Sequence, residues 1–517
     1  MGFQIGQVLR QGALRHGERV ACVLVDAAGH GPDRTLTYGE LDAASRSVAR
    51  ALLSRGLPQG ARVALSAENG DGFLAGFFGA CYAGCTVVPI PILSAPAEVA
   101  LRVQRASCAA ALVDEAREPL VQGACPKLGV LRVDALVTTA AGTNADLTAR
   151  TRDGDWPTDV PVDLDSSADA LLLFTSGTTG GAKAARITHA SLLTHTAALV
   201  HHTLQLSADD VVLGALPFTH SFGLRMSVLA PLYAGASVLV FPRFDRARTL
   251  AALDAGRVTW APAVPTMFAA WTGTPGGGPV ARGLRSALSA GAPLPAELRR
   301  RAAARLGCPV RQGYGLTEAT FSTVDDGRVG DDAEHVGPPV WGVELRIRDA
   351  EGHDLPSGSE GEVWVRGANV MAGYLDDDEA TAAVFEQGWL RTGDLGRLDA
   401  HGQLVLVDRL KDLILRGGAN VYPSEVEDAL SLHPSVLEVA VIGRPDDYYG
   451  EEVVAVVVPR GEAPSTDELT EHARLHLAKN KLPAEYVFTD ALPLGPSGKV
   501  LKRTLRERYG ARRVHQP

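Results

Sequence analysis

Residues 171–183 read LLLFTSGTTGGAK, an apolar run followed by hydroxyl-bearing residues, glycines and one lysine. The apolar residues predict a buried strand that leads into a loop of small residues. Gly177, Gly180 and Gly181 can adopt positive φ and let the backbone approach a ligand closely. Backbone N–H groups and hydroxyls donate hydrogen bonds, and Lys183 adds a positive charge. The stretch therefore has the chemistry of a polyphosphate cradle.

The loop differs from the P-loop of nucleoside triphosphatases, GxxxxGK followed by Ser or Thr. Here Lys183 follows Ala182, and no Ser or Thr comes next. A P-loop enzyme is therefore disfavoured. A flexible linker is disfavoured too, because an apolar strand precedes the loop and a helical pattern follows it at 191–204.

Length and composition indicate a multi-domain globular enzyme. A chain of 517 residues exceeds what one core usually holds, so two or more domains are expected. The net charge of -10 argues against nucleic acid or an anionic membrane as partners. The sequence has no signal-peptide pattern and no apolar run of about 18 residues. We expect a cytoplasmic protein whose six cysteines are buried free thiols.

The order of strand and helix patterns predicts an α/β fold. Short apolar runs alternate with helical patterns through the first 400 residues, which favours layered, buried sheets. Expected strands include 20–26, 63–69, 170–174, 211–218, 236–242, 361–367 and 403–409, and expected helices 46–56, 191–204 and 296–307. After about residue 410, capping boxes at Ser424 and Ser465 and strands at 437–443 and 453–459 predict a compact α+β unit. We predict a large N-terminal domain, 1–409, and a small C-terminal domain, 410–517.

Further motifs follow the glycine-rich loop along the chain. They are LPFTHSFG (216–223), SAGAPLP (289–295), QGYGLTEAT (312–320), WLRTGDLG (389–396), DRLKDLILRGGANVYPSEVE (408–427) and LGPSGKVLKRTLR (494–506). In this order they closely resemble the motifs of the adenylate-forming superfamily, which includes acyl- and aryl-CoA ligases, adenylation domains and luciferases. The resemblance covers nearly the whole chain. Two small residues depart from it, Ala182 where the family has Pro and Ala184 where it has Gly, and we expect changed loop mobility without loss of function.

The resemblance implies a ligase that works in two steps. A carboxylic acid would react with ATP to form an acyl-adenylate and pyrophosphate, with Mg²⁺ as cofactor, and the acyl group would then pass to a thiol, first of all coenzyme A. The C-terminal domain would be a mobile lid that rotates about a hinge at Lys411. The loop around Gly418 would then open a path for the pantetheine arm.

The resemblance also implies which residues bind the nucleotide. The candidates are Thr175, Ser176, Gly177, Thr178, Thr179, Lys183, Gly291, Ala292, Tyr314, Asp394 and Arg409. Thr178, Thr179 and Lys183 would hold the β- and γ-phosphates. Tyr314 would stack on adenine, and Asp394 would accept hydrogen bonds from the ribose hydroxyls.

Four residues are the catalytic candidates by resemblance. Thr317 would contact the α-phosphate, and Glu318 would bind Mg²⁺, a hard cation that prefers oxygen ligands. Lys499 would neutralise the charge that develops on the carboxylate and the α-phosphate. His220 would anchor the acid substrate.

Phe222, Val264, Thr266 and Gly313 are the expected lining of the acid pocket. Amino-acid-activating members of the superfamily generally place an Asp in this region to pair with the substrate amine, and THSFG has none, so the resemblance favours an acyl or aryl acid over an amino acid. Arg225 follows on the same predicted helix. It could meet a second acidic group of the substrate, but we expect it to face solvent or an internal acid.

Other functions stay open at this stage. The acceptor could be a phosphopantetheinyl carrier protein, or another nucleophile such as an amine, and nitrite could replace the carboxylic acid. A luciferase-type oxygenase would need a luciferin-like acid and oxygen. A non-catalytic scaffold would predict the loss of Glu318 or Lys499, and both are present. The basic residues from Lys502 to Arg513 could meet a CoA phosphate or an acidic carrier protein, although a solvated charge run is at least as plausible.

Overall fold

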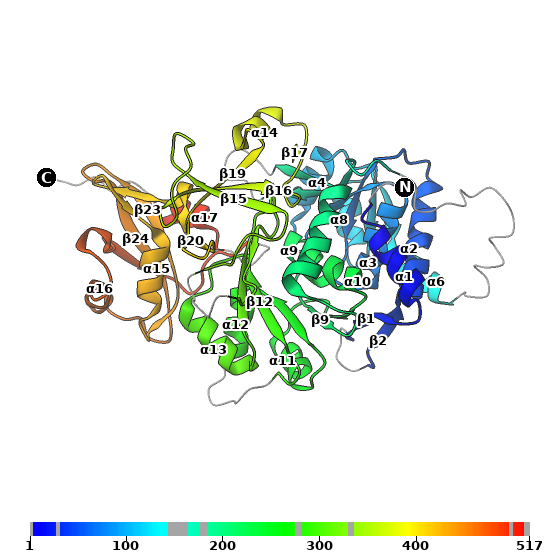
Figure 1. Cartoon of the computed structure of the whole chain (residues 1–517), viewed down its shortest axis with the longest axis horizontal. Helices are drawn as coiled ribbons and strands as arrows, with labels where there is room; N and C mark the ends of the chain where they lie inside the picture. Colours follow the sequence, from blue (N-terminus) through cyan, green and yellow to red (C-terminus); the bar gives the residue numbers. More distant parts are fainter. Residues whose placement is uncertain are drawn as a thin grey trace. The chain divides into compact units, whose positions relative to one another are not determined.

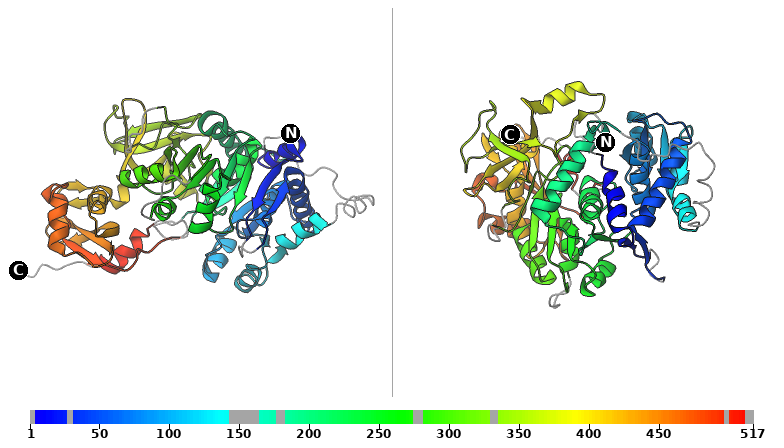
Figure 2. Two further views of the ribbon diagram at one scale, coloured as in Figure 1. Left: turned by 90° about the horizontal axis from the view of Figure 1, so that it is seen from below. Right: turned by 45° about the vertical axis from the view of Figure 1, so that its right-hand side comes forward.

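The structure, a computed structural model, describes residues 4–26, 31–142, 164–175, 183–273, 281–328, 335–495 and 500–510. The fold is mixed α/β, as predicted (Figure 1). Packing divides the chain into two compact units, and Figure 2 gives two further views of them. Unit 1 comprises Met1–Glu344 and Val365–Leu390, and unit 2 comprises Leu345–Trp364 and Arg391–Pro517. The predicted hinge after Arg409 lies inside unit 2 and stays a prediction.

Unit 1 contains an eight-stranded sheet in the order β14-β13-β12-β11-β9-β10-β1-β2. Its strands are β1 (Val20–Leu24), β2 (Arg34–Thr37), β9 (Val211–Gly214), β10 (Ser237–Val240), β11 (Trp260–Ala263), β12 (Ser286–Ala290), β13 (Val310–Tyr314) and β14 (Thr323–Val324). The inner strands are parallel, and β2 and β14 are antiparallel edges. Parallel strands need helical crossovers that cover both faces, and the inner strands β9 to β13 are accordingly largely buried.

A seven-stranded sheet in the same unit has the order β17-β8-β7-β4-β3-β5-β6. Its strands are β3 (Arg62–Ser66), β4 (Thr86–Pro89), β5 (Ala110–Val113), β6 (Gly129–Arg132), β7 (Asp169–Phe174), β8 (Ala184–Thr188) and β17 (Gly373–Tyr374). The strands β7 and β8 pair antiparallel, with Phe174 opposite Ala184. The glycine-rich stretch is thus enclosed by a hairpin, and strand β8 separates it from the helix predicted to follow.

The helices of unit 1 cover these sheets. They are α1 (Gln7–His16), α2 (Tyr38–Leu53), α3 (Asp71–Tyr82), α4 (Pro96–Arg105), α5 (Glu118–Ala124), α6 (Val133–Gly142), α8 (His189–Ala198), α9 (Ser221–Leu224), α10 (Ala230–Ala234), α11 (Arg246–Asp254), α12 (Pro265–Thr272), α13 (Ala296–Leu306) and α14 (Asp378–Val384). Helix α3 is buried along almost its whole length. A Cβ at Gly79 would lie 2.6 Å from the Cβ of Val48, so this glycine allows α2 and α3 to approach closely. The predicted helix 191–204 continues past α8 as a π-helix, η1 (Leu199–Leu204), and a second π-turn, η2 (Arg225–Leu229), follows α9.

A five-stranded sheet has the order β15-β16-β19-β18, with β20 beside β19. Its strands are β15 (Val343–Arg348), β16 (Gly361–Gly367), β18 (Phe385–Glu386), β19 (Trp389–Leu398) and β20 (Leu404–Arg409). The 3₁₀ turn η3 (Leu410–Asp412) follows β20 directly.

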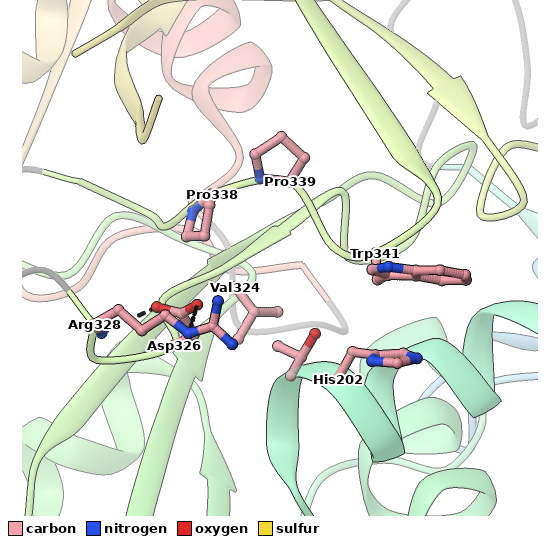
Figure 3. A pocket seen from close by; sticks show the side chains of 8 residues that line it. His202, Val324, Asp326, Arg328, Pro338, Pro339 and Trp341 are labelled. Atoms are coloured by element: carbon pink, nitrogen blue, oxygen red, sulfur yellow. Dashed lines mark hydrogen bonds and ion pairs between the residues drawn. The ribbon is translucent and has the colours of Figure 1, made fainter. Parts of the chain in front are cut away.

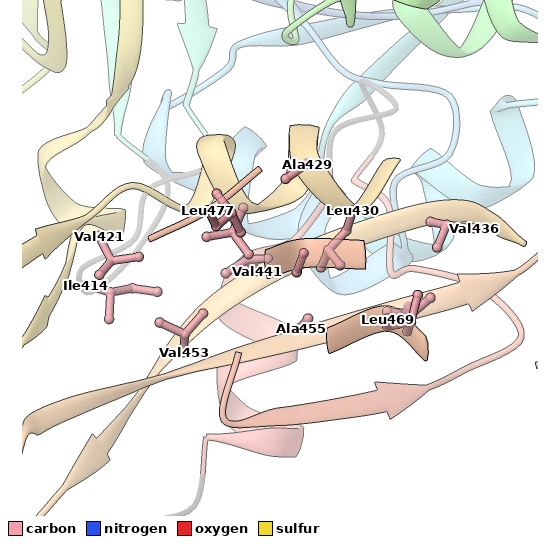
Figure 4. Packing of buried hydrophobic residues seen from close by; sticks show 13 residues of the cluster. Ile414, Val421, Ala429, Leu430, Val436, Val441, Val453, Ala455, Leu469 and Leu477 are labelled. Carbon is pink, nitrogen blue, oxygen red and sulfur yellow. The ribbon is translucent and has the colours of Figure 1, made fainter. Parts of the chain in front are cut away.

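The C-terminal part of unit 2 has its own sheet, in the order β22-β21-β24-β23 with β25 beside β24. Its elements are β21 (Ile414–Arg416), β22 (Ala419–Val421), α15 (Pro423–Ser431), β23 (Val436–Asp446), β24 (Gly450–Pro459), α16 (Thr466–Arg474), η4 (Lys479–Lys481), β25 (Glu485–Phe488) and α17 (Lys502–Tyr509). Leu430 of α15 and Leu469 of α16 pack on one face of this sheet (Figure 4). Val426 of α15 belongs to the same cluster. Leu505 of α17 packs on the other face. The unit therefore has its own apolar core.

The two predicted capping boxes have different outcomes. Ser465 caps α16, because its side chain accepts a hydrogen bond from the backbone N–H of Glu468. The prediction of a capping box at Ser424 is wrong. Tyr422 is the N-cap residue of α15, and the Ser424 hydroxyl instead donates to the carbonyl of Val407.

The cysteine and membrane expectations are also tested. All six cysteines are free thiols, as predicted, but Cys108 and Cys125 are only half-buried. Burial raises the pKa of Cys22 to about 12, which makes this thiol unreactive at neutral pH. In the described part of the chain, no helix has the length and apolar character that a bilayer crossing requires.

Candidate active site

Two ends of the glycine-rich loop are held together by the hairpin. The backbone N–H of Thr175 donates to the carbonyl of Lys183 at 2.8 Å. Between them, Ser176, Gly177, Thr178 and Thr179 lie outside the described residues. The Lys183 ammonium lies 5.1 Å from the centre of the Tyr374 ring, a cation–π distance.

Tyr374 connects the loop lysine to the predicted metal ligand. Its hydroxyl donates to Oε1 of Glu318 at 2.9 Å. Burial, and then the charge of Glu318, raise the pKa of Tyr374 far above its usual range, so the phenol stays a hydrogen-bond donor. Tyr374 therefore contacts both residues, Lys183 over its ring and Glu318 at its hydroxyl, although the two are 135 positions apart in the sequence.

Backbone contacts fix the turn that carries Thr317 and Glu318. The N–H of Leu316 donates to the carbonyl of Ala319 at 3.0 Å, and the N–H of Met371 donates to the carbonyl of Glu318 at 2.8 Å. A Cβ at Gly315 would lie 2.2 Å from the backbone nitrogen of Phe321. Only glycine fits there, so the YGLTE turn is tight and its two polar side chains are half-buried.

The residues predicted for the adenine side lie at neighbouring strand ends. Strands β12 and β13 pair with Ala290 opposite Gly313. Gly291, with φ 89°, and Tyr314 therefore follow directly after one paired position. Ala292 is exposed and the Tyr314 ring is buried. This is the carboxyl edge of a parallel sheet, where ligands bind in α/β folds.

Two of the four predicted acid-pocket residues, Phe222 and Gly313, lie against the ring of Phe321. The Phe222 and Phe321 rings pack edge to face with centroids 5.3 Å apart. A Cβ at Gly313 would lie 3.1 Å from the Phe321 ring. His220 caps α9, because its Nδ1 accepts a hydrogen bond from the N–H of Phe222. Gly313, Phe222 and His220 are thus associated through Phe321 and this cap.

Val264 and Thr266 occupy the start of helix α12. Val264 is the N-cap residue and is half-buried, whereas Thr266 is exposed. None of the described contacts ties either of them to Phe321.

Several residues near the site carry no recognisable sequence signal. Tyr374 stands in an ordinary Gly-Tyr pair, and Phe321 and His195 belong to no motif. The expectation for Arg225 is wrong, because its side chain is shielded from solvent and meets no acid in the part of the chain that the structure describes. It is buried, and its Nη1 donates to Nδ1 of His195 at 3.0 Å and to the carbonyl of Leu192 at 3.3 Å.

A pocket in unit 1 is lined by residues outside the predicted set, although one of them, Val324, pairs with Gly313 in the β13–β14 register. It is lined by His202, Thr203, Val324, Asp326, Arg328, Pro338, Pro339 and Trp341 (Figure 3). Trp341 stacks on His202 with ring centroids 4.7 Å apart, and Asp326 pairs with Arg328. None of the predicted catalytic or nucleotide-binding residues lines this pocket.

In unit 2 the two ribose candidates are paired with each other. Asp394 and Arg409 are opposite in the β19–β20 register, and Nε of Arg409 lies 2.9 Å from Oδ1 of Asp394. Asp394 is buried, so its charge is balanced by an arginine that is partly exposed. The pair presents a carboxylate in a fixed orientation.

The hinge and lid candidates lie further along unit 2. Burial, followed by the charge of Arg409, lowers the pKa of Lys411. Gly418 has φ 80° and open space where a Cβ would be. Lys499 lies outside the described residues, but Leu494 and Val500 form a β-bridge that closes its loop.

The basic C-terminal segment is engaged within unit 2. Lys502 pairs with Glu427 at 2.7 Å, Arg503 with Glu507 at 2.8 Å, and Arg506 with Asp412 at 2.8 Å. Arg512 and Arg513 lie outside the described residues. Lys502, Arg503 and Arg506 therefore serve internal pairs, whereas no ion pair of Arg508 is seen among the described residues.

Comparison with known families agrees with this arrangement of motifs. Residues 9–375 match the AMP-binding enzyme family, and residues 425–499 match the AMP-binding enzyme C-terminal domain. The chain belongs to the AMP-binding enzyme family. The family assignment confirms the predicted superfamily and the fold of large N-terminal and small C-terminal domains.

Proteins similar to this chain include CoA ligases. A feruloyl-CoA synthase of an Amycolatopsis species is 36% identical over 94% of this chain and 96% of its own. A sulfoacetate–CoA ligase of Cupriavidus necator is 35% identical over 91% and 92%. ATP-bound MatB from Rhodopseudomonas palustris superposes with a TM-score of 0.89 at 31% identity over 99% of each chain. The protein is an AMP-forming ligase that activates a carboxylic acid with ATP as an acyl-adenylate and transfers the acyl group to a thiol, as predicted.

Proposed function

We propose that this ligase forms the CoA thioester of an aromatic carboxylic acid. The observation that carries the proposal is the edge-to-face contact of Phe222 and Phe321 beside Gly313, which offers flat apolar surfaces to a planar ring. The 36% identity to a feruloyl-CoA synthase supports an aryl or arylpropenoic acid.

In this proposal the chain's own residues divide the work between the two units. Lys183, Thr178 and Thr179 hold the outer phosphates, Thr317 contacts the α-phosphate, and Lys499 neutralises charge in the first half-reaction. Asp394 and Arg409 orient the ribose. Residues 410–517 form the moving lid, with the hinge at Lys411.

The residues present fit a magnesium ion. Glu318 offers a carboxylate, an oxygen ligand of the type that Mg²⁺ prefers, and Tyr374 fixes it through one oxygen. No cluster of three His, Cys, Asp or Glu side chains suited to a metal occurs in the described ranges, which agrees with an ion held by few protein groups and by the phosphates. When bound, Mg²⁺ would neutralise phosphate charge.

The acid and the acceptor are tested by separating the half-reactions. ATP–pyrophosphate exchange is measured without CoA across benzoic, cinnamic, fatty, dicarboxylic and amino acids. We expect exchange to be strongest with one aromatic acid. The acyl-adenylate is then offered CoA or a phosphopantetheinyl carrier protein, and thioester is expected with CoA. Exchange only with aliphatic acids would contradict the aromatic class, and transfer only to the carrier protein would contradict CoA.

Gly418 provides a separate test of the second half-reaction. A Gly418→Leu variant places a side chain in the proposed path of the pantetheine arm and in a positive-φ position. Thioester formation is expected to fall about 100-fold, while ATP–pyrophosphate exchange stays near the wild-type rate. Gly461→Leu is the matched control, because Gly461 also has positive φ and open space around it in unit 2. Equal losses in both half-reactions would remove Gly418 from the path.

A further inference from the structure

Arg225 is a buried cation that has no acidic partner among the described residues. Its side chain is 2% exposed, and its Nη1 donates to Nδ1 of His195 and to the carbonyl of Leu192. Burial lowers the pKa of Arg225 to about 9, so the guanidinium remains charged at neutral pH. Burial of a charge is costly, and a cation without a counter-ion needs a reason.

His195 also contacts a third residue through its other ring nitrogen. It is 1% exposed, and burial, together with the charge of Arg225, lowers its pKa well below the usual range. The imidazole is therefore neutral. Because Nδ1 accepts from Arg225, the proton is on Nε2, which donates to the carbonyl of Phe321 at 3.1 Å.

The carbonyl at the end of this chain belongs to a strained residue. Phe321 has φ 50°, a left-handed conformation that a bulky residue adopts only when its surroundings impose it. Its ring lies against Phe222 and over Gly313, two residues of the proposed acid pocket. The backbone conformation of Phe321 therefore sets the position of its ring, which forms one side of the proposed pocket.

We infer that Arg225 and His195 are positioning residues that set the acid specificity of this enzyme by holding Phe321 in its left-handed conformation. The inference rests on the proposed function and names a determinant of its substrate class. The charged donor gives the His195 link a stronger hydrogen bond than a neutral one would. Arg225 acts through His195, which stands between it and Phe321, so Arg225 does not bind the substrate.

The test compares the acid selectivity of single and double variants. Arg225→Met keeps the length and removes the donors, and Phe321→Gly removes both the ring and the strain. The ratio of kcat/KM for a bulkier naphthoic acid to that for benzoic acid is measured, together with KM for ATP. Arg225→Met is expected to raise this ratio about tenfold with KM for ATP unchanged. Phe321→Gly is expected to raise it at least as much, and the double variant no further than Phe321→Gly.

Controls separate this role from a general loss of packing. Arg117→Met removes another buried arginine of unit 1, which bonds Ser66, and should leave the ratio unchanged. His195→Leu should reproduce the shift. His195→Gln, which keeps a donor and an acceptor, should restore the wild-type ratio. Thermal unfolding of each variant shows whether it is folded. If Arg225→Met does not fold, the comparison of His195→Leu with His195→Gln tests the inference instead.

Three results would overturn the inference. One is an equal loss of kcat/KM for all acids, which is the effect of a structural role alone. Another is a further change of the ratio when Arg225→Met is added to Phe321→Gly. The third is a loss confined to dicarboxylic acids, which would make Arg225 a direct ligand of the substrate. A preference of the wild-type enzyme for a non-aromatic acid would refute the proposed function instead. The role of Arg225 is then tested with the ratio of kcat/KM for a long acid to that for a short acid of the preferred class.

Discussion

Replacement of Lys499 by alanine is expected to slow acyl-adenylate formation by about 100- to 1,000-fold, roughly 2.7–4 kcal/mol of transition-state stabilisation. Negative charge accumulates on the attacking carboxylate and the α-phosphate in this step, and a lysine brought to that point neutralises it. The Leu494–Val500 bridge and the Lys502–Glu427 ion pair hold both sides of the Lys499 loop in unit 2. The side chain can then be removed without dismantling its support.

The same variant should retain the second half-reaction. Thioester formation from a chemically supplied acyl-adenylate and CoA is expected within a few-fold of wild type, since the charge on the phosphates no longer increases in that step. Arg503→Ala is the matched control, because Arg503 is an exposed cation on the next helix that pairs only locally with Glu507. Loss of both half-reactions in Lys499→Ala, with an intact fold, would refute the division of labour.

The regular part of the fold could be predicted from hydrophobic patterns. Strand β7 and helix α13 match the predicted ranges 170–174 and 296–307 within one residue. A short apolar run and a 3.6-residue period are each compatible with few other structures. The Ser424 box failed for a tertiary reason. Asp408 accepts a hydrogen bond from the N–H of Ser424, so a neighbouring strand performs the capping that local sequence assigned to the serine.

The site shows the same division between local and long-range information. The YGLTE turn could be found through its resemblance to a superfamily motif, and the structure gives a reason for its glycine, a 2.2 Å backbone approach that leaves no room for a Cβ. Tyr374 and His195 belong to no such motif. Their roles arise from partners far away, Glu318 for Tyr374 and Phe321 for His195, and the residue type alone cannot specify which distant side chain it will meet.

For Arg225, the general tendency of arginine to be exposed or paired with an acid led to a wrong prediction. Arginine is rarely buried without an acid, so solvent or an acidic partner was the reasonable expectation. The structure satisfies the guanidinium with a neutral imidazole and a carbonyl instead. A hydrophobic pattern contains no information about such an arrangement, because it depends on which polar atoms of α8 face the start of η2.

Glu318→Gln is expected to lower the rate of ATP–pyrophosphate exchange by more than about 100-fold and to raise the Mg²⁺ concentration needed for half-maximal exchange. Glutamine keeps the shape and can still accept the Tyr374 hydrogen bond, so the change removes chiefly the negative charge that the metal would require. Exchange is measured across a Mg²⁺ titration at saturating ATP and acid. Glu297→Gln serves as the control, because Glu297 is a half-exposed glutamate of α13 in the same unit that pairs with Arg300.

Tyr374→Phe separates orientation of this carboxylate from its charge. The variant removes the 2.9 Å hydrogen bond and keeps the ring beside Lys183. We expect a smaller loss, about tenfold, because the carboxylate remains but is less well oriented. The Glu318→Gln, Tyr374→Phe double variant should be no slower than Glu318→Gln alone, since the tyrosine acts through the carboxylate. If the two losses multiply, Tyr374 has an independent role, through Lys183. If Glu318→Gln leaves the Mg²⁺ dependence unchanged, the metal is held elsewhere.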